Sequence, residues 1–135
     1  MNRKNILISG VFVLISILLA VAVSQSGSAN IEATLRPPDF EVASALITKG
    51  GCSACHTIPA IEGAVGTLGP SWCEPASKFQ AGEVNLEFIM ESIVDPSAIV
   101  NEAFNPVMPA NFGDTFSHVE LTTLATFIAT LNCSE

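Results

Sequence analysis

The chain has 135 residues, 49% of them hydrophobic, and a formal net charge of −8; it is long enough for one domain besides its apolar N-terminal stretch. From Pro37 to the C-terminus, two lysines oppose twelve aspartates and glutamates, a formal balance of −10. This charge argues against nucleic acid and anionic lipid headgroups as partners. It either attracts a basic partner protein by electrostatic steering or simply keeps a small domain soluble.

The N-terminal segment predicts a membrane anchor. Residues 6–23 contain no charged side chain, and Arg3 and Lys4 precede them. A run of about 18 apolar residues is long enough to cross a bilayer as a helix, and the two basic residues keep the N-terminus cytoplasmic. We therefore expect a single-pass anchor at residues 1–23, with the rest of the chain on the periplasmic, extracytoplasmic side. The alternative is a signal peptide that is cleaved within residues 26–29.

A linker and a short helix follow the anchor. Residues 24–38 are polar or mixed in character without a sustained period, which predicts a linker before a domain at 39–135. Asp39 suits the N-cap of a helix over 40–49, and Gly50-Gly51 ends that helix. Its expected apolar side consists of Phe40, Ala43 and Ile47, with Leu46 close by.

Two further helices are predicted after a passage to about Gly82 that is rich in glycine and proline. Asn85 caps a helix that runs through Val94. After a loop over 104–116, Ser117 and Glu120 form a capping box, and the helix beyond it runs to about Asn132. No segment predicts a strand, so the fold class is all-α. The expected apolar stripes are Leu86, Ile89, Met90 and Ile93 in one helix, and Leu121, Leu124, Ala125, Ile128 and Leu131 in the other.

Cys52-Ser53-Ala54-Cys55-His56 has the C-x-x-C-H pattern of covalent haem attachment. Two thiols at this spacing can add to the two vinyl groups of one haem, and the adjacent imidazole can then bind the iron. A redox disulfide or half of a zinc site would also use C-x-x-C. No βαβ pattern accompanies the motif, however, and the other zinc-ligand candidates are scattered. A bound haem c would also fill the thin core of so small a helical domain.

Met108 is the predicted second axial ligand of the iron. It lies in a loop with no helical face to pack, and Pro109 restricts it to an extended backbone. Met90 belongs to an apolar helix face, where core packing is the expected role. His118 falls at the exposed start of the last helix. Ligation by His56 and Met108 would close both axial positions, which suits electron transfer.

With these residues placed, the chain from Asp39 onward resembles a class I cytochrome c. The resemblance rests on the order of helix, C-x-x-C-H, Gly69-Pro70, middle helix, Met-Pro loop and C-terminal helix. It implies that the first and last helices cross, with Ala43 where the family usually has glycine and Phe127 as the C-terminal aromatic residue. Because alanine is small, we expect a slightly wider crossing with the fold retained.

The same resemblance assigns two further residues to the haem site. It implies that the Pro70 carbonyl accepts a hydrogen bond from His56 Nδ1, a contact that orients the imidazole. It also places Trp72 where the family has an apolar residue against the haem.

Residues 91–98 and 105–109 are similar to two subgroups of that family. One is the cytochrome c domain of caa3-type oxidases, and the other is the monohaem cytochrome subunit of alternative complex III. No copper-binding subunit II domain precedes the motif, so the first identity does not hold as such, and a subunit of alternative complex III or a free-standing anchored carrier is expected. The resemblance implies a single-electron carrier rather than an enzyme, within a respiratory or photosynthetic chain and beside other redox subunits of a membrane complex. The alternative is a haem-based gas or redox sensor, or a peroxidase-like enzyme, with a labile sixth ligand.

Cys73 and Cys133 lie outside the haem motif. In an oxidising compartment an intramolecular disulfide between them is the natural interpretation. Two free thiols, or a bridge to a neighbouring subunit, are the alternatives.

Overall fold

The computed structural model describes residues 36–133. The predicted anchor at 1–23 and residues 24–35 of the predicted linker lie outside the described residues. Within residues 36–133, no helix is both long enough and apolar enough to cross a membrane. The fold of this part is all-α: helices occur without any strand, and the extended contacts between residues 36 and 133 are limited to an isolated bridge between Thr57 and Val65.

Helix α2 (Phe40–Gly50) agrees with the prediction to within one residue. The Asp39 side chain accepts a hydrogen bond from the backbone N–H of Glu41 at 2.9 Å, so it caps the helix as expected. Gly51 ends the helix in the left-handed conformation at φ 65°, a conformation that costs glycine little. Ala43, Leu46 and Ile47 are buried, whereas Phe40 is 51% exposed and only partly joins the apolar side.

Helices α4 (Leu86–Val94) and α6 (His118–Ala129) also form where the sequence predicts them. The Asn85 side chain accepts a hydrogen bond from Phe88 N–H at 2.9 Å. The capping box of Ser117 and Glu120 is present in full. Helix α6 ends at Ala129, earlier than the predicted end near Asn132, and Thr130 is its C-cap.

Within residues 36–133, the structure contains two α-helices that the sequence does not predict. Helix α3 (Cys73–Gln80) lies in the passage rich in glycine and proline, for which no helix was predicted. It tolerates Pro75 because the first-turn N–H groups of a helix have no intrahelical acceptor, so their loss costs little. The short α5 (Phe112–Thr115) lies in the predicted loop over 104–116. It is a single turn, too short for a period to be recognised.

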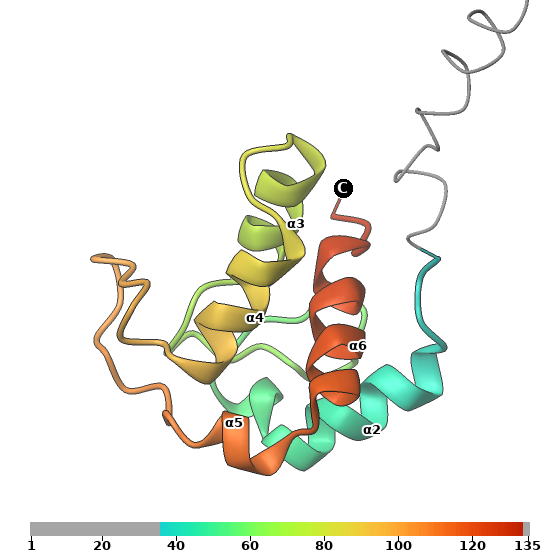
Figure 1. The fold of residues 1–135 in the computed structure, drawn as a ribbon, viewed down its shortest axis with the longest axis horizontal. Helices are drawn as coiled ribbons and strands as arrows, with labels where there is room; N and C mark the ends of the chain where they lie inside the picture. Colours follow the sequence, from blue (N-terminus) through green and yellow to red (C-terminus); the bar gives the residue numbers. More distant parts are fainter. Residues whose placement is uncertain (1–35, 134–135) are drawn as a thin grey trace, which may run out of the picture. The chain divides into compact units, whose positions relative to one another are not determined.

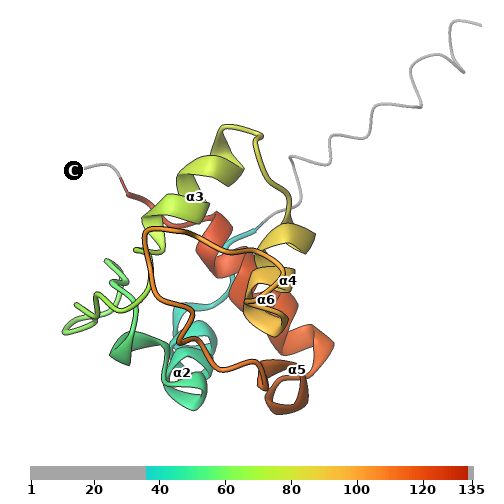
Figure 2. The same ribbon diagram turned by 90° about the vertical axis from the view of Figure 1, so that its left-hand side faces the viewer.

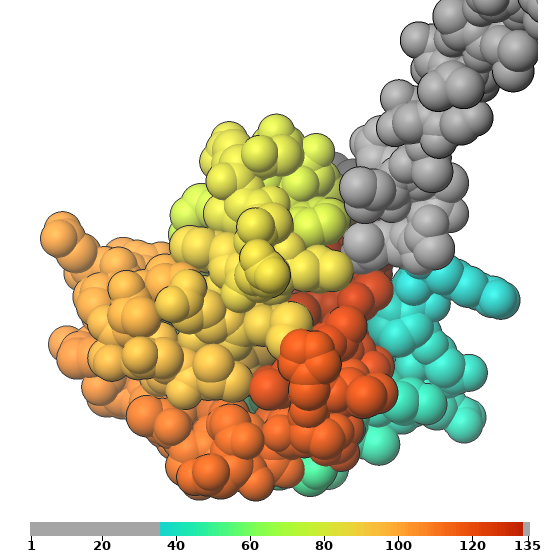
Figure 3. Space-filling view, viewed as in Figure 1, coloured from blue at the N-terminus to red at the C-terminus, as the bar shows by residue number. Residues whose placement is uncertain are grey.

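Helix α6 is the centre of the described domain. It contacts α2, α3 and α4, and in the space-filling view it lies between α4 and α2 on one face (Figure 3). Between α2 and α4 lie the 3-10 helix η2 (Cys52–Ala54) and α3, and part of the loop that joins these two passes behind α6 (Figure 1). The whole predicted stripe of α6 and its continuation is buried: Leu121, Leu124, Ala125, Ile128 and Leu131.

Helices α2 and α6 contact each other. Ala43 has no exposed surface and Phe127 is 7% exposed, and both belong to the same core cluster. The loop from Asp95 to Asn111 joins α4 to α5 and runs across the front of the domain in Figure 2. The helices therefore support two long loops, residues 55–72 and 95–111, and these loops carry the candidate site.

Candidate functional site

The C-x-x-C-H segment forms one tight turn directly after α2. Gly51 begins the 3-10 helix η2, and the Cys52 carbonyl then accepts hydrogen bonds from the N–H groups of Cys55 at 3.1 Å and His56 at 3.0 Å. Both Cys52 and Cys55 are free, half-buried thiols. Two sulfur atoms and one imidazole are thereby held on a single turn.

A second segment runs along this turn and holds it by backbone hydrogen bonds. Gly69 N–H donates to the Cys55 carbonyl at 2.9 Å, and Trp72 N–H donates to the Thr57 carbonyl at 3.0 Å. The Thr57 hydroxyl donates to the Gly66 carbonyl at 2.9 Å. These bonds are made by Cys55 and Thr57, the two neighbours of His56 in sequence. The backbone that carries the imidazole therefore has little conformational freedom.

The imidazole of His56 is oriented by the same segment. Its Nδ1 atom lies 2.7 Å from the Pro70 carbonyl oxygen, as the resemblance implies. A carbonyl only accepts, so Nδ1 must carry the proton and Nε2 is left with a free lone pair for a metal. Gly69 lies close to the imidazole ring and leaves no room for a side chain there, because a Cβ atom at Gly69 would lie 2.5 Å from His56 Cε1.

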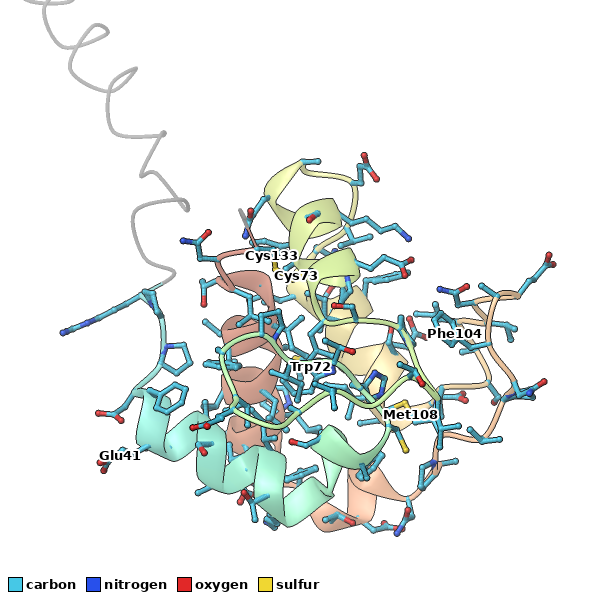
Figure 4. All side chains as sticks on the ribbon, turned by 180° about the vertical axis from the view of Figure 1, so that it is seen from behind. Glu41, Trp72, Cys73, Phe104, Met108 and Cys133 are labelled. Atoms are coloured by element: carbon cyan, nitrogen blue, oxygen red, sulfur yellow. A yellow bond between two sulfur atoms is a disulfide. The ribbon has the colours of Figure 1, made fainter. Side chains whose placement is uncertain are left out.

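Trp72 connects this imidazole to the hydrophobic core. Its side chain is buried, and its ring centroid lies 6.2 Å from that of His56 and 6.4 Å from that of Phe127. The contact with Phe127 is edge-on, the arrangement favoured by aromatic rings. Trp72 is thus placed between the candidate ligand and helix α6 (Figure 4).

Cys52 lacks the lowered pKa of an activated redox cysteine. Burial raises the pKa of the Cys52 thiol from 9.0 to about 11, so the thiol stays protonated at neutral pH. Thioredoxin-type motifs instead lower the pKa of one cysteine. In addition, no three side chains among His, Cys, Asp and Glu converge on a possible metal site anywhere in residues 36–133.

The three remaining candidate ligands differ in their surroundings. Met108 is half-buried, whereas the residues on both sides of it, Val107 and Pro109, are exposed. Figure 4 shows Met108 and Phe104 on the same loop. Met90 instead contacts α6, with its sulfur 3.9 Å from the Thr122 hydroxyl, as expected for a packing residue. His118 is exposed at the first position of α6, also as expected.

The structure joins Cys73 and Cys133 in a disulfide with a Cα–Cα distance of 5.6 Å. The bond ties the first residue of α3 to the chain just beyond α6 (Figure 4). This is the intramolecular pairing expected from the sequence.

Two residues that position His56 carried no separate signal in the sequence analysis. The close approach of Gly69 and the hydroxyl bond of Thr57 depend on the path of the whole loop from Cys55 to Trp72. Gly69 stood next to Pro70 in the resemblance, but its own steric role was not assigned.

Comparison with known proteins does not extend these observations. No protein-family model matches the chain, and no curated protein matches it at a significant level.

Proposed function

We propose that this protein is a membrane-anchored, monohaem c-type cytochrome that transfers single electrons. The observation that carries the proposal is the bond of 2.7 Å between His56 Nδ1 and the Pro70 carbonyl, on a turn that also presents two free thiols. It leaves one imidazole nitrogen for a metal beside two sulfur atoms for covalent attachment.

The residues present fit a haem c. Cys52 and Cys55 would hold the macrocycle by thioethers, and His56 would bind the iron from one side. Met108 would bind it from the other, since it is half-buried between exposed neighbours. The group would supply a one-electron couple between ferric and ferrous iron. The protein's own part is to hold both axial ligands in place, because a fixed ligand set needs little rearrangement on electron transfer.

The charges of the domain support docking to a basic partner. Lys49 pairs with Glu120 at 2.7 Å, and Lys78 pairs with Glu74 at 2.8 Å. Both lysines within residues 36–133 are thereby neutralised, and the remaining carboxylates leave a strongly anionic surface. Such a surface raises the association rate with a cationic protein surface. We place the protein beside other redox subunits, as in a quinol-oxidising complex such as alternative complex III.

The membrane assignment rests on the sequence of residues 1–23 alone. An anchor there would place the haem domain on the periplasmic side with the N-terminus cytoplasmic. The domain would then meet its electron donor and acceptor at the periplasmic surface of the membrane that holds the anchor.

Absorption spectra of the full chain, purified from membranes, test the proposal. The oxidised, reduced, and reduced carbon monoxide-treated forms are compared, with Cys52→Ala/Cys55→Ala as the control that cannot attach haem covalently. We expect a low-spin c-type spectrum that carbon monoxide leaves unchanged, and no covalent haem in the control. A wild-type chain without haem contradicts the proposal. A clear response to carbon monoxide favours the sensor or peroxidase-like alternative.

A further inference from the structure

The disulfide is linked to the candidate iron ligand by a short chain of contacts. Cys73, which is bonded to Cys133, directly follows Trp72 in sequence. Trp72 is 6% exposed, and its ring packs between the rings of His56 and Phe127. A displacement of residue 73 must therefore be transmitted to the indole that lies against the imidazole.

A second connection joins the same two helices farther from the site. The Gln80 side-chain amide donates to the carbonyls of Ala129 at 3.3 Å and Leu131 at 2.9 Å. Gln80 is the last residue of α3, whereas Cys73 is the first. Helix α3 is thus tied to the end of α6 at both of its ends, and only the disulfide adjoins Trp72.

The imidazole has few alternatives to its present orientation while Trp72 stays in place. Gly69 approaches one part of the ring so closely that a Cβ would collide with it, and Trp72 flanks the ring at 6.2 Å between centroids. The hydrogen bond from Nδ1 to Pro70 depends on this orientation. Movement of Trp72 would open space for the ring to tilt and would weaken that bond.

We infer that the Cys73–Cys133 disulfide is a positioning element for His56, acting through Trp72, and that it tunes the reduction potential of the bound haem. The inference rests on the proposed function. A hydrogen bond from Nδ1 makes the imidazole a stronger donor to iron, and stronger donation favours the ferric state. Loss of the disulfide should weaken this bond and shift the midpoint potential to a more positive value.

The test uses the full chain in detergent and compares Cys73→Ser/Cys133→Ser with Gln80→Leu. Both variants loosen the contact between α3 and α6, but only the first removes the tie beside Trp72. We expect a positive shift of the midpoint potential in the disulfide variant and a much smaller one in Gln80→Leu. The resonance of the His56 Nδ1 proton in the reduced protein should move in the same variant. Dithiothreitol treatment of the wild-type chain provides the same comparison without a substitution.

Trp72→Leu tests the route of the coupling. In that background, loss of the disulfide should cause little further shift, because residues acting through one contact are not additive. Trp72→Phe should restore part of the dependence on the disulfide.

The outcomes separate this inference from the proposed function. A wild-type chain without haem overturns both. A normal haem spectrum with a midpoint potential that is insensitive to the disulfide overturns the inference alone. Equal shifts in the disulfide variant and in Gln80→Leu, or fully additive shifts with Trp72→Leu, also contradict it.

Discussion

The Nδ1 atom of His56 lies 2.7 Å from the carbonyl oxygen of Pro70, 14 positions further along the chain. This bond assigns the imidazole tautomer, with the proton on Nδ1 and the lone pair on Nε2. The loop from His56 to Pro70 therefore holds in place the imidazole that we propose binds the haem iron. Its consequences can be tested by substitutions on both sides of the bond.

Gly69→Ala should displace the imidazole of His56. The new Cβ atom would lie 2.5 Å from Cε1, a contact that real structures do not sustain. We expect a loss of unfolding free energy of about 1–3 kcal/mol, typical of overpacking, and a weaker low-spin spectrum. Urea unfolding and absorption spectra measure the two effects.

Gly113→Ala is the matched control for that substitution. A Cβ atom there would meet only Val94, at an ordinary distance of 3.9 Å. Its stability should change by less than about 1 kcal/mol, the range of helix propensities, with an unchanged spectrum. Equal effects of the two alanines would show that Gly69 has no special steric role.

Met108→Ala should open the second axial position of the iron. The reduced variant should bind carbon monoxide and show a markedly lower midpoint potential, because methionine ligation raises it. Carbon monoxide difference spectra check this result. Met90→Leu is the control, since the Met90 sulfur faces Thr122 on α6. If Met90→Leu opened the iron site and Met108→Ala did not, the ligand assignment would be wrong.

Removal of the disulfide should lower the stability of the domain. The bond joins residues 60 positions apart, and the chain-entropy model assigns about 4 kcal/mol to a closed loop of that length. Urea unfolding of Cys73→Ser/Cys133→Ser should therefore have a much lower midpoint than that of the wild type.

Dithiothreitol should lower the urea concentration at which the wild type is half unfolded. It should leave that of the double variant unchanged. Mass analysis under non-reducing conditions checks the pairing itself. Two free thiols at Cys73 and Cys133 in the purified protein would rule it out.

The Lys49–Glu120 ion pair should make stability depend on acid pH. The hydrogen bond from Lys49, followed by that from Ser117 N–H, lowers the pKa of Glu120 from 4.5 to about 2. Because the folded-state pKa is the lower one, this contribution is present above about pH 4.5. It is lost as the pH falls towards about 2.

Glu120→Gln measures that contribution directly. The wild type should be modestly more stable than the variant at pH 7, since exposed pairs contribute little, and the difference should vanish near pH 2. Urea unfolding at both pH values gives the comparison. A difference for Glu120→Gln that is independent of pH would contradict the assignment.

The positions of α2, α4 and α6 followed from local signals. Asp39, Asn85 and the Ser117–Glu120 box cap their helices in the structure as they were expected to from the sequence. Such caps act within three or four residues, so a single sequence is enough to recognise them. Helix α3 was not predicted because it is short, contains Pro75 and has few apolar residues from which a period could be recognised. In the folded domain it contacts α6.

The sequence by itself supplied the hypothesis for the candidate site: the C-x-x-C-H motif, the prediction of Met108 rather than Met90 as a ligand, and the two cysteines left to pair. The tertiary structure decided how these groups are held. The contact of Gly69 with His56, the place of Trp72 between His56 and Phe127, and the attachment of α3 to α6 join residues far apart in sequence. Such contacts depend on the path of a long loop over packed helices, and no local pattern of residues specifies that path.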